Sequence, residues 1–261
     1  MGALNVTRIG EGVMRIEMAR PDVLNAFNKA MIAEIDAAFA RASGDAEVRC
    51  VVLSGQGRAF CSGADIEWMK RQSTAAESAN LDDARRFAAM LYRIASCAKP
   101  TIASIQGACM GGGVGLACAC DFAIATEGAR FAVSEARFGI LPAVISPYLI
   151  AAVGVRRARQ LAISTLRITS QEACAFGLVS KVVPETQLDD AVHALARELH
   201  AAAPNAIAEI KTLYARLGEL ASPEVRELTA VTIARVRGTP EAREGFAAFL
   251  EKRAPAWSRD G

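Results

Sequence analysis

The feature that most constrains the fold is a change in hydrophobic periodicity near Leu188. Before Leu188, segments with strand periodicity alternate with helical patterns: residues 13–18 alternate apolar and polar side chains, and residues 29–42 place apolar side chains at helical spacing. After Leu188 only helical patterns follow. Alternating strands and helices predict parallel strands joined by right-handed crossovers. The sequence therefore predicts an α/β body over residues 1–187 and a helical region over residues 188–261.

Other segments fit the same division. Short apolar runs bounded by turn residues predict further strands, and amphipathic stretches predict helices. Three helices of the C-terminal region begin at or beside a proline, a favoured residue of the first turn. The expected strands are 48–54, 101–105, 121–126 and 130–133; the expected helices are 81–98, 188–202, 204–217, 223–236 and 240–252; and 107–119 should begin as a glycine-rich turn and continue as a helix.

Size, charge and hydropathy exclude several classes of protein. A chain of 261 residues, 52% hydrophobic and 22% charged, can bury one sizeable core and is not of disordered composition. The net charge of +2, from 30 basic and 28 acidic residues, argues against nucleic acid as the main partner, because phosphate binding needs clustered cations. The apolar stretch 107–125 is interrupted by glycines and by Asp121, and the N-terminus has no apolar signal segment. We therefore expect a cytoplasmic protein with no nucleic-acid partner and no membrane segment.

The seven cysteines indicate a reducing compartment. Most lie inside apolar stretches, as small buried hydrophobes do, and none forms a C-x-x-C pair. Free thiols in odd number are typical of the cytosol. We therefore expect no zinc site and no other bound metal.

Two segments rich in small residues, 60–69 and 106–116, carry the functional signal. Each lies where a predicted strand gives way to a predicted helix. Small residues let a ligand approach the backbone, and a helix N-terminus offers free N–H groups with a favourable dipole. Two such amides converging on one oxygen would form an oxyanion hole, where a donor lowers the barrier by about 3 kcal/mol. Taken alone, each segment is better explained by packing, since residues 111–115 are not followed by the lysine and hydroxyl residue of a phosphate-binding loop.

Short motifs accompany these two segments in a fixed order along the chain, at 20–26, 60–65, 99–101, 107–113, 120–121, 134–135, 175–179 and 251–253. Together they resemble the enoyl-CoA hydratase/isomerase (crotonase) family over nearly the whole chain. The resemblance implies a spiral of ββα turns followed by a helical trimerisation region, and a homotrimer or a dimer of trimers. It also implies an acyl-CoA thioester as substrate, with coenzyme A as part of that substrate and no separate cofactor.

The resemblance also assigns roles to residues. The amides of Ala64 and Gly112 would be the oxyanion-hole donors, and Glu135 would be the catalytic carboxylate. Lys252 would reach a coenzyme A phosphate from a neighbouring subunit. The residues expected to bind the acyl-CoA or to line its channel are Val23, Leu24, Ala26, Ser62, Asp65, Ile66, Glu67 and Gly111.

The sequence departs from the family pattern at a second catalytic carboxylate. Hydratases of the family carry it two positions after the glycine triplet, where this chain has Gly115, which leaves the place empty. Glu127, an alternative acid, is expected at the surface. Residues 140–148, together with Gly115, resemble a bacterial subgroup of methylglutaconyl-CoA and related branched enoyl-CoA hydratases. Arg137 could pair with a substrate carboxylate or be an ordinary surface arginine.

One carboxylate is compatible with two reactions. Desolvation in an apolar pocket would raise the pKa of Glu135 towards values useful for proton transfer. Glu135 could move a proton between C2 and C4, which is Δ3,Δ2-enoyl-CoA isomerisation, or it could activate a water that adds to a 2-enoyl-CoA. Residue chemistry favours the isomerase and the resemblance at 140–148 favours the hydratase, which we place first. A weakly active acyl-CoA-binding protein is a third interpretation. The basic cluster at 156–159 is expected to begin a helix or to contact a phosphate.

Overall fold

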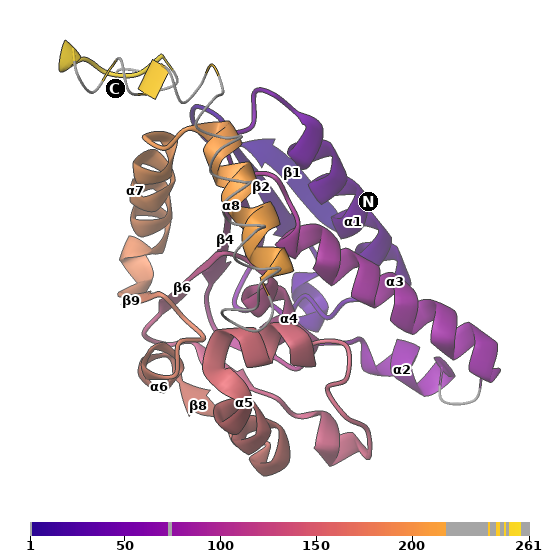
Figure 1. Ribbon diagram of the computed structural model, residues 1–261. Coiled ribbons are helices and arrows are strands. Elements are labelled where there is room, and N and C mark those ends of the chain that lie inside the picture. Colours follow the sequence, from indigo (N-terminus) through magenta and orange to yellow (C-terminus); the bar gives the residue numbers. More distant parts are fainter. Residues whose placement is uncertain are drawn as a thin grey trace.

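A six-stranded and a three-stranded sheet organise the chain, with helices on both faces of the larger sheet (Figure 1). The computed structural model describes residues 2–72, 75–217, 240, 244–245, 248 and 251–256. In the larger sheet β1 is antiparallel to β2, and the other neighbours are parallel. Its order is β1 (Leu4–Arg8), β2 (Val13–Met18), β3 (Cys50–Gly55), β4 (Thr101–Ile105), β6 (Phe122–Thr126), β9 (Lys181–Val183); the smaller sheet has β5 (Ala108–Met110), β7 (Arg130–Ala132) and β8 (Ile168–Thr169).

From β4 to β7, consecutive strands alternate between the two sheets, and helical segments follow each pair. β4 and β5 lead into α4, and β6 and β7 lead into η2 and α5. A parallel bridge between Cys61 and Cys109 continues the smaller sheet towards the segment after β3. The predicted α/β spiral of ββα turns is therefore confirmed. The helical segments are η1 (Pro21–Val23), α1 (Lys29–Gly44), α2 (Ile66–Gln72), α3 (Glu77–Ala95), α4 (Gly112–Ala119), η2 (Glu135–Phe138), α5 (Ser146–Ser164), α6 (Ser170–Ala175), η3 (Glu185–Gln187), α7 (Leu188–His200) and α8 (Pro204–Arg216).

The larger sheet separates two apolar cores. Successive side chains of a strand point to opposite faces, so Val51 and Leu53 of β3 join the main core, to which α1, α3 and α4 contribute. Cys50 and Val52 face the other way, into a smaller core to which α7 contributes Val192. The first helix of the C-terminal region thus packs directly on the sheet.

Several expected elements are confirmed. The strands expected at 13–18 and 101–105 have the same bounds in the structure. The helices expected at 29–42, 188–202 and 204–217 agree with α1, α7 and α8 within two residues at each end. The helix expected at 223–236, and most of the one expected at 240–252, lie outside the described residues. None of the helices in the described part of the chain is both long enough and apolar enough to cross a bilayer.

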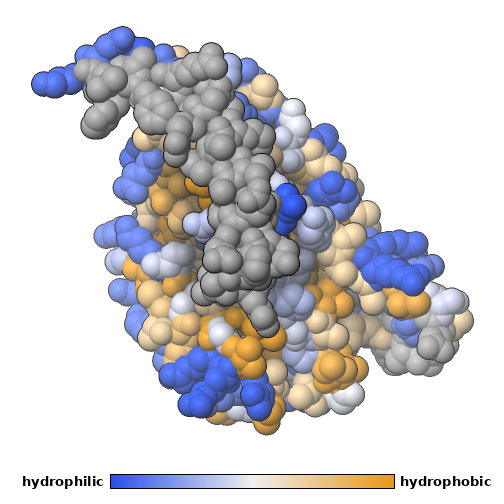
Figure 2. Space-filling view, viewed as in Figure 1, coloured by the Kyte–Doolittle hydropathy of each residue, from blue (hydrophilic) through white to orange (hydrophobic). Residues whose placement is uncertain are grey.

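The sequence offers a helix start only at the basic cluster 156–159, so it does not predict the first half of α5. Gly154 has φ 74° and breaks the helical geometry inside the element, so the basic cluster 156–159 begins its second half. The guanidinium of Arg157 lies 4.3 Å from the ring centroid of Phe176, which gives this arginine a packing role. Ile150 and Ile163 of α5 are exposed apolar side chains. Figure 2 shows apolar surface in its lower part, the region where Figure 1 places α5.

Candidate active site

The loop between β2 and α1 is held by one buried side chain. Asn25 is fully buried, and both Leu24 and Asn25 have left-handed backbone conformations, with φ of 52° and 55°. The side-chain oxygen of Asn25 accepts from Arg20 N (2.9 Å), and its Nδ2 donates to the carbonyls of Gln56 (3.0 Å) and Ala59 (2.8 Å). Asparagine tolerates this conformation, and its amide replaces the hydrogen bonds that a regular element would supply. The loop is therefore fixed against the end of β3.

An ion pair joins this loop to the segment that leads into α2. Arg20 donates from Nη2 to Asp65 Oδ2 (2.9 Å) and from Nη1 to the carbonyl of Ala26 (2.5 Å). The other carboxylate oxygen of Asp65 accepts from the backbone amides of Glu67 (3.1 Å) and Trp68 (3.2 Å). Burial opposes ionisation, but the bond to Arg20 and these two amides prevail and lower the pKa of Asp65. Asp65, expected to bind substrate, thus has structural partners in this chain.

The backbone amide of Ala64 stays free because the residues on either side of it, and not Ala64 itself, hydrogen-bond to Phe27. Phe27 and Ala64 form a parallel bridge, in which Phe27 N donates to Gly63 O (2.9 Å) and Asp65 N donates to Phe27 O (2.9 Å). Ser62 N donates to the carbonyl of Leu24 (2.9 Å), which fixes the preceding turn. Among the described residues, the N–H of Ala64 has no acceptor. It therefore remains available for a ligand.

A second free amide lies at the junction of β5 and α4. Gly112 is the first residue of α4, and its N–H likewise has no acceptor within the described residues. A Cβ built on Gly63 would lie 3.7 Å from Gly112 N, so the 63–64 peptide lies against the first turn of α4. A Cβ on Gly112 itself would lie 2.4 Å from Phe27 Cζ, so only glycine fits there. The structure thus brings the two predicted amides of Ala64 and Gly112 to the same place.

Glu135 faces this place from η2. Its Oε1 lies 3.2 Å from the position that a Cβ on Gly111 would take, next to the free amide of Gly112. Its Oε2 is buried and has no hydrogen-bond partner in the described part of the chain. Burial is the main cause of a raised pKa for Glu135, because desolvation penalises the charged carboxylate. A carboxyl group in this state is suited to exchanging a proton with a ligand.

Aromatic rings close the apolar side of the arrangement. The ring of Phe27 stacks on that of Phe87 at 4.9 Å between centroids and meets the indole of Trp68 edge-on at 6.4 Å. The indole Nε1 is buried without a partner among the residues described. The rings of Phe27 and Phe87 lie against the position that a Cβ on Gly112 would take.

The space beside Gly115, where a side chain would stand, is occupied by Ile145. A Cβ built on Gly115 would lie 2.3 Å from Cγ2 and 2.8 Å from Cβ of Ile145. Gly115 supplies no carboxylate, and Ile145, 30 positions further along the chain, occupies the space that a side chain there would take. No local signal around Gly115 could have shown this.

The remaining predicted residues differ in exposure. Ser62 donates from Oγ to the carbonyl of Val23 (3.2 Å), and Val23 and Ile66 are exposed. Glu67 is exposed and Ala26 is buried.

Other candidates do not face the free amides. Arg137 donates from Nε to Thr165 Oγ1 (2.8 Å), and Glu127 is exposed, as expected. Lys252 is exposed, and its expected contact with a coenzyme A phosphate at a neighbouring subunit stays a prediction. In the described residues, no group of three or more histidine, cysteine or acidic side chains could hold a metal ion.

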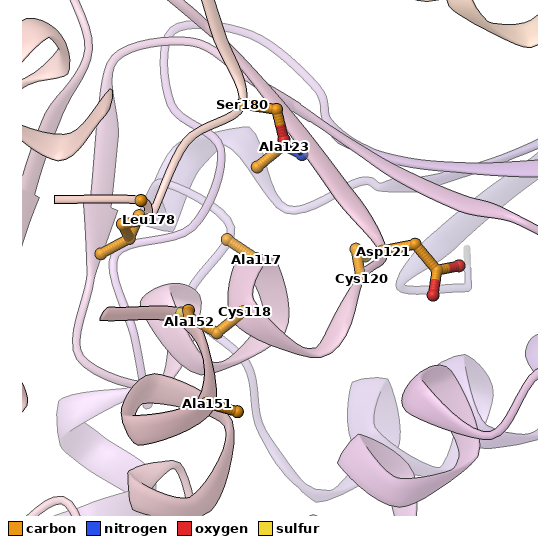
Figure 3. A pocket seen from close by; sticks show the side chains of 10 residues that line it. Ala117, Cys118, Cys120, Asp121, Ala123, Ala151, Ala152, Leu178 and Ser180 are labelled. Atoms are coloured by element: carbon orange, nitrogen blue, oxygen red, sulfur yellow. Dashed lines mark hydrogen bonds between the residues drawn. The ribbon is translucent and has the colours of Figure 1, made fainter. Parts of the chain in front are cut away.

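A cavity of about 230 Å³ lies elsewhere, at the C-terminal end of α4 (Figure 3). In Figure 3 the carboxylate of Asp121 points away from the other lining residues, and it binds Lys211 Nζ (2.6 Å) and Thr101 N (2.8 Å). Burial raises the pKa of Cys118 to about 12, so this thiol is not a nucleophile at neutral pH. The cavity is therefore separate from the chemistry around Gly112. Its lining residues are Ala117, Cys118, Cys120, Asp121, Ala123, Ala151, Ala152, Gly177, Leu178 and Ser180.

Two free amides beside a desolvated carboxylate define a class of site that can hold a negatively charged oxygen and move a proton next to it. Comparison with known proteins agrees: the sequence model of the enoyl-CoA hydratase/isomerase family matches residues 8–260. The chain belongs to this family and is an enzyme of the hydratase/isomerase class.

Individual relatives cover nearly the whole chain. A Rhodobacter capsulatus protein named "Probable enoyl-CoA hydratase" is 37% identical over 254 residues, which cover 95% of both chains. A peroxisomal Δ(3,5)-Δ(2,4)-dienoyl-CoA isomerase from Arabidopsis thaliana is 30% identical over 258 residues, covering 95% of this chain and 93% of its own. The crystal structure of an enoyl-CoA hydratase from Shewanella pealeana superposes with a TM-score of 0.93 at 34% identity, over 98% of this chain and 96% of the other. Hydratases and an isomerase thus match at similar levels.

Proposed function

We propose that the chain is an enoyl-CoA hydratase, which adds water to a 2-enoyl-CoA thioester through an enolate held by the amides of Ala64 and Gly112. The observation that carries the proposal is the position of Glu135. Its carboxylate is desolvated, lacks a hydrogen-bond partner for Oε2 among the described residues, and lies over Gly111, beside the free amide of Gly112.

A single carboxylate suffices for this reaction. Glu135 takes a proton from water as the water oxygen bonds to C3, and the electron pair of the C2=C3 bond moves to make the thioester an enolate. The two amides stabilise the enolate oxygen, each lowering the barrier by about 3 kcal/mol. The enolate then collapses, and C2 takes the proton from Glu135, which returns to its charged form. One water has been added, and coenzyme A has remained on the substrate throughout.

Δ3,Δ2-enoyl-CoA isomerisation is the second candidate, favoured by the contact between Ile145 and Gly115. Ile145 makes the place of a second carboxylate apolar, and an isomerase needs neither that carboxylate nor a bound water. Glu135 would then take a proton from C2 and return it to C4.

The acyl group of the proposed substrate is apolar near the reacting carbons and can be branched there. Phe27 and Phe87 lie next to Gly112, and Trp68 packs edge-on against Phe27, so these rings favour hydrocarbon. A distal carboxylate, as in methylglutaconyl-CoA, would need a cation. Arg137 is two residues from Glu135 on a helix of three residues per turn and binds Thr165, so it points in another direction. Branching without a distal charge therefore fits this chain better.

Glu135→Gln is the first test, since it keeps the size of the side chain and removes its basicity. We expect turnover to fall by about 10²- to 10⁴-fold, while the dissociation constant for the acyl-CoA product changes little. Wild-type turnover in this variant would rule out the mechanism.

A substrate panel tests the reaction type. Crotonyl-CoA, 3-methylglutaconyl-CoA and a 3-enoyl-CoA are assayed in ¹⁸O-labelled water. The hydratase places the label at C3, whereas an isomerase converts the 3-enoyl-CoA without incorporating it. No turnover on any member, with binding retained, would instead support an acyl-CoA-binding protein of little activity.

The proposed assembly is a homotrimer or a dimer of trimers. Exposed apolar side chains on α5 and α8, among them Val155 and Ile210, supply surface of the kind that subunit contacts bury. Light scattering after size-exclusion chromatography measures the mass directly, and a monomer at micromolar concentration would contradict this assembly.

A further inference from the structure

The contact between Gly115 and Ile145 joins the two elements that carry the proposed chemistry. Ile145 is 2% exposed, and its Cβ and Cγ2 occupy the space where any side chain at position 115 would begin. Gly115 follows Gly112 by three residues on α4, so the two lie on one side of a rigid helix one turn apart. The side chain of Ile145 therefore packs against α4 where Gly115 has no side chain, at a fixed position relative to the Gly112 amide.

The segment from Glu135 to Ile145 has few other attachments. Backbone amides 136–144 donate only to carbonyls between 134 and 141, within the part of the chain described. One side chain of the segment bonds outside it, where Arg137 reaches Thr165 at the far end of α5. Residues 136–141 are exposed. At the end of the segment, the carbonyls of Pro142 and Ala143 accept from Ser146 of α5, and Val144 packs against the main core. The side chain of Ile145 adds a direct contact with α4 at Gly115.

We propose that Ile145, seated on Gly115, is a positioning residue that sets the distance between the Glu135 carboxylate and the Gly112 amide. This inference rests on the proposed function, in which Glu135 carries the proton. The physical reason is that a base acts only within hydrogen-bond reach of its proton, and a displacement of about 1 Å can cost on the order of 100-fold in rate.

Two substitutions of Ile145 separate this contact from bulk packing. Valine loses the terminal methyl group but keeps Cγ2, the atom that meets Gly115. Leucine keeps the volume of isoleucine but carries no methyl group on Cβ. If the contact positions Glu135, Ile145→Val keeps kcat within about threefold, and Ile145→Leu lowers kcat by about tenfold or more with little change in KM. If only apolar volume matters, leucine performs at least as well as valine.

A second pair of variants tests the space at Gly115 that Ile145 occupies. Gly115→Ala places a methyl group 2.3 Å from Ile145 Cγ2, so the side chain of Ile145 must move away from α4, and kcat should fall by about tenfold or more. The double variant Gly115→Ala/Ile145→Gly lacks both Cβ and Cγ2 at position 145, so the new methyl group enters the space that these two atoms vacate. We expect this double variant to recover part of the kcat lost in Gly115→Ala.

The measurements are kcat and KM on the panel substrate that the wild type turns over fastest, the pH at which kcat falls to half on the acidic side, and urea unfolding of each variant. A fall in kcat in folded Ile145→Leu and Gly115→Ala, with the acidic limb moved towards the ordinary glutamate range, supports the proposal. Unchanged kcat and pH profile, with only stability lowered, overturn it. Glu135→Gln is measured alongside: its loss of turnover upholds the proposed function whatever the Ile145 series shows, and its full turnover overturns that function.

Discussion

The buried side chain of Asn25 gives a direct test of how the loop before α1 is held. It makes three hydrogen bonds, one from Arg20 N and two to the carbonyls of Gln56 and Ala59, and each contributes about 1 kcal/mol net. Its φ of 55° would cost an alanine about 1 kcal/mol more. Asn25→Ala should therefore lower the free energy of unfolding by about 4 kcal/mol, a large share of the roughly 5–15 kcal/mol typical of a domain.

Equilibrium unfolding in urea measures this loss, provided that the m-value stays that of the wild type. Asn28→Ala is the matched control: Asn28 is only partly buried and accepts one bond, from Met31 N (3.1 Å), as the cap of α1, so its loss should cost about 1 kcal/mol. Asn25→Gly separates the two causes, because glycine accepts the left-handed backbone and should be about 1 kcal/mol less costly than alanine. The reasoning is refuted if Asn25→Ala is no less stable than Asn28→Ala.

Three further outcomes are expected. Because the pKa of Asp65 is lowered in the folded state, its ionised carboxylate stabilises the fold above the ordinary aspartate range, and this stabilisation is lost as pH falls through the folded-state pKa. The difference in the free energy of unfolding between wild type and Asp65→Asn, measured in urea, should therefore shrink on acidification. A constant difference would contradict this. Gly112→Ala places a methyl group 2.4 Å from Phe27 Cζ and should lower kcat about tenfold or more, and the double variant Gly112→Ala/Phe27→Leu should recover part of this loss. Initial rates of both variants measure the effect. Wild-type turnover in Gly112→Ala would count against the role of this amide. Burial raises the pKa of Cys61 to about 12 and that of Cys109 well above its usual range, so iodoacetamide should modify both thiols only after unfolding. Peptide mass spectrometry identifies the modified cysteines. Modification in the folded protein would show that burial does not protect them.

Local patterns predicted those elements whose signal is local. The strand at 13–18 alternates apolar and polar side chains, and α1 repeats its apolar side chains at helical spacing, so both could be recognised from neighbours in the sequence. α5 could not, because Gly154 in its interior interrupts the helical pattern. Its first half is held by tertiary contacts, among them those of Leu149 in the main core.

The candidate site divides in the same way. The sequence alone located the two small-residue segments, because a close approach to backbone requires glycine or alanine and a helix N-terminus leaves amides free. The resemblance to a family singled out Glu135. Neither could show that Asp65 binds Arg20, since these residues are 45 positions apart and an ion pair leaves no periodic trace.

The sequence by itself thus determined the α/β body, the helical region and the residue types available for chemistry, because hydrophobic periodicity and glycine spacing are properties of neighbouring residues. The spiral of ββα turns was implied only by the resemblance to a family. Tertiary structure alone decided which amides remain without acceptors, how far Glu135 is desolvated, and what fills the space at Gly115. These depend on where distant segments meet: Phe27 pairs beside Ala64, and Ile145 rests on α4. Packing at such meeting points is set by shape in three dimensions, for which a linear sequence carries no local signal.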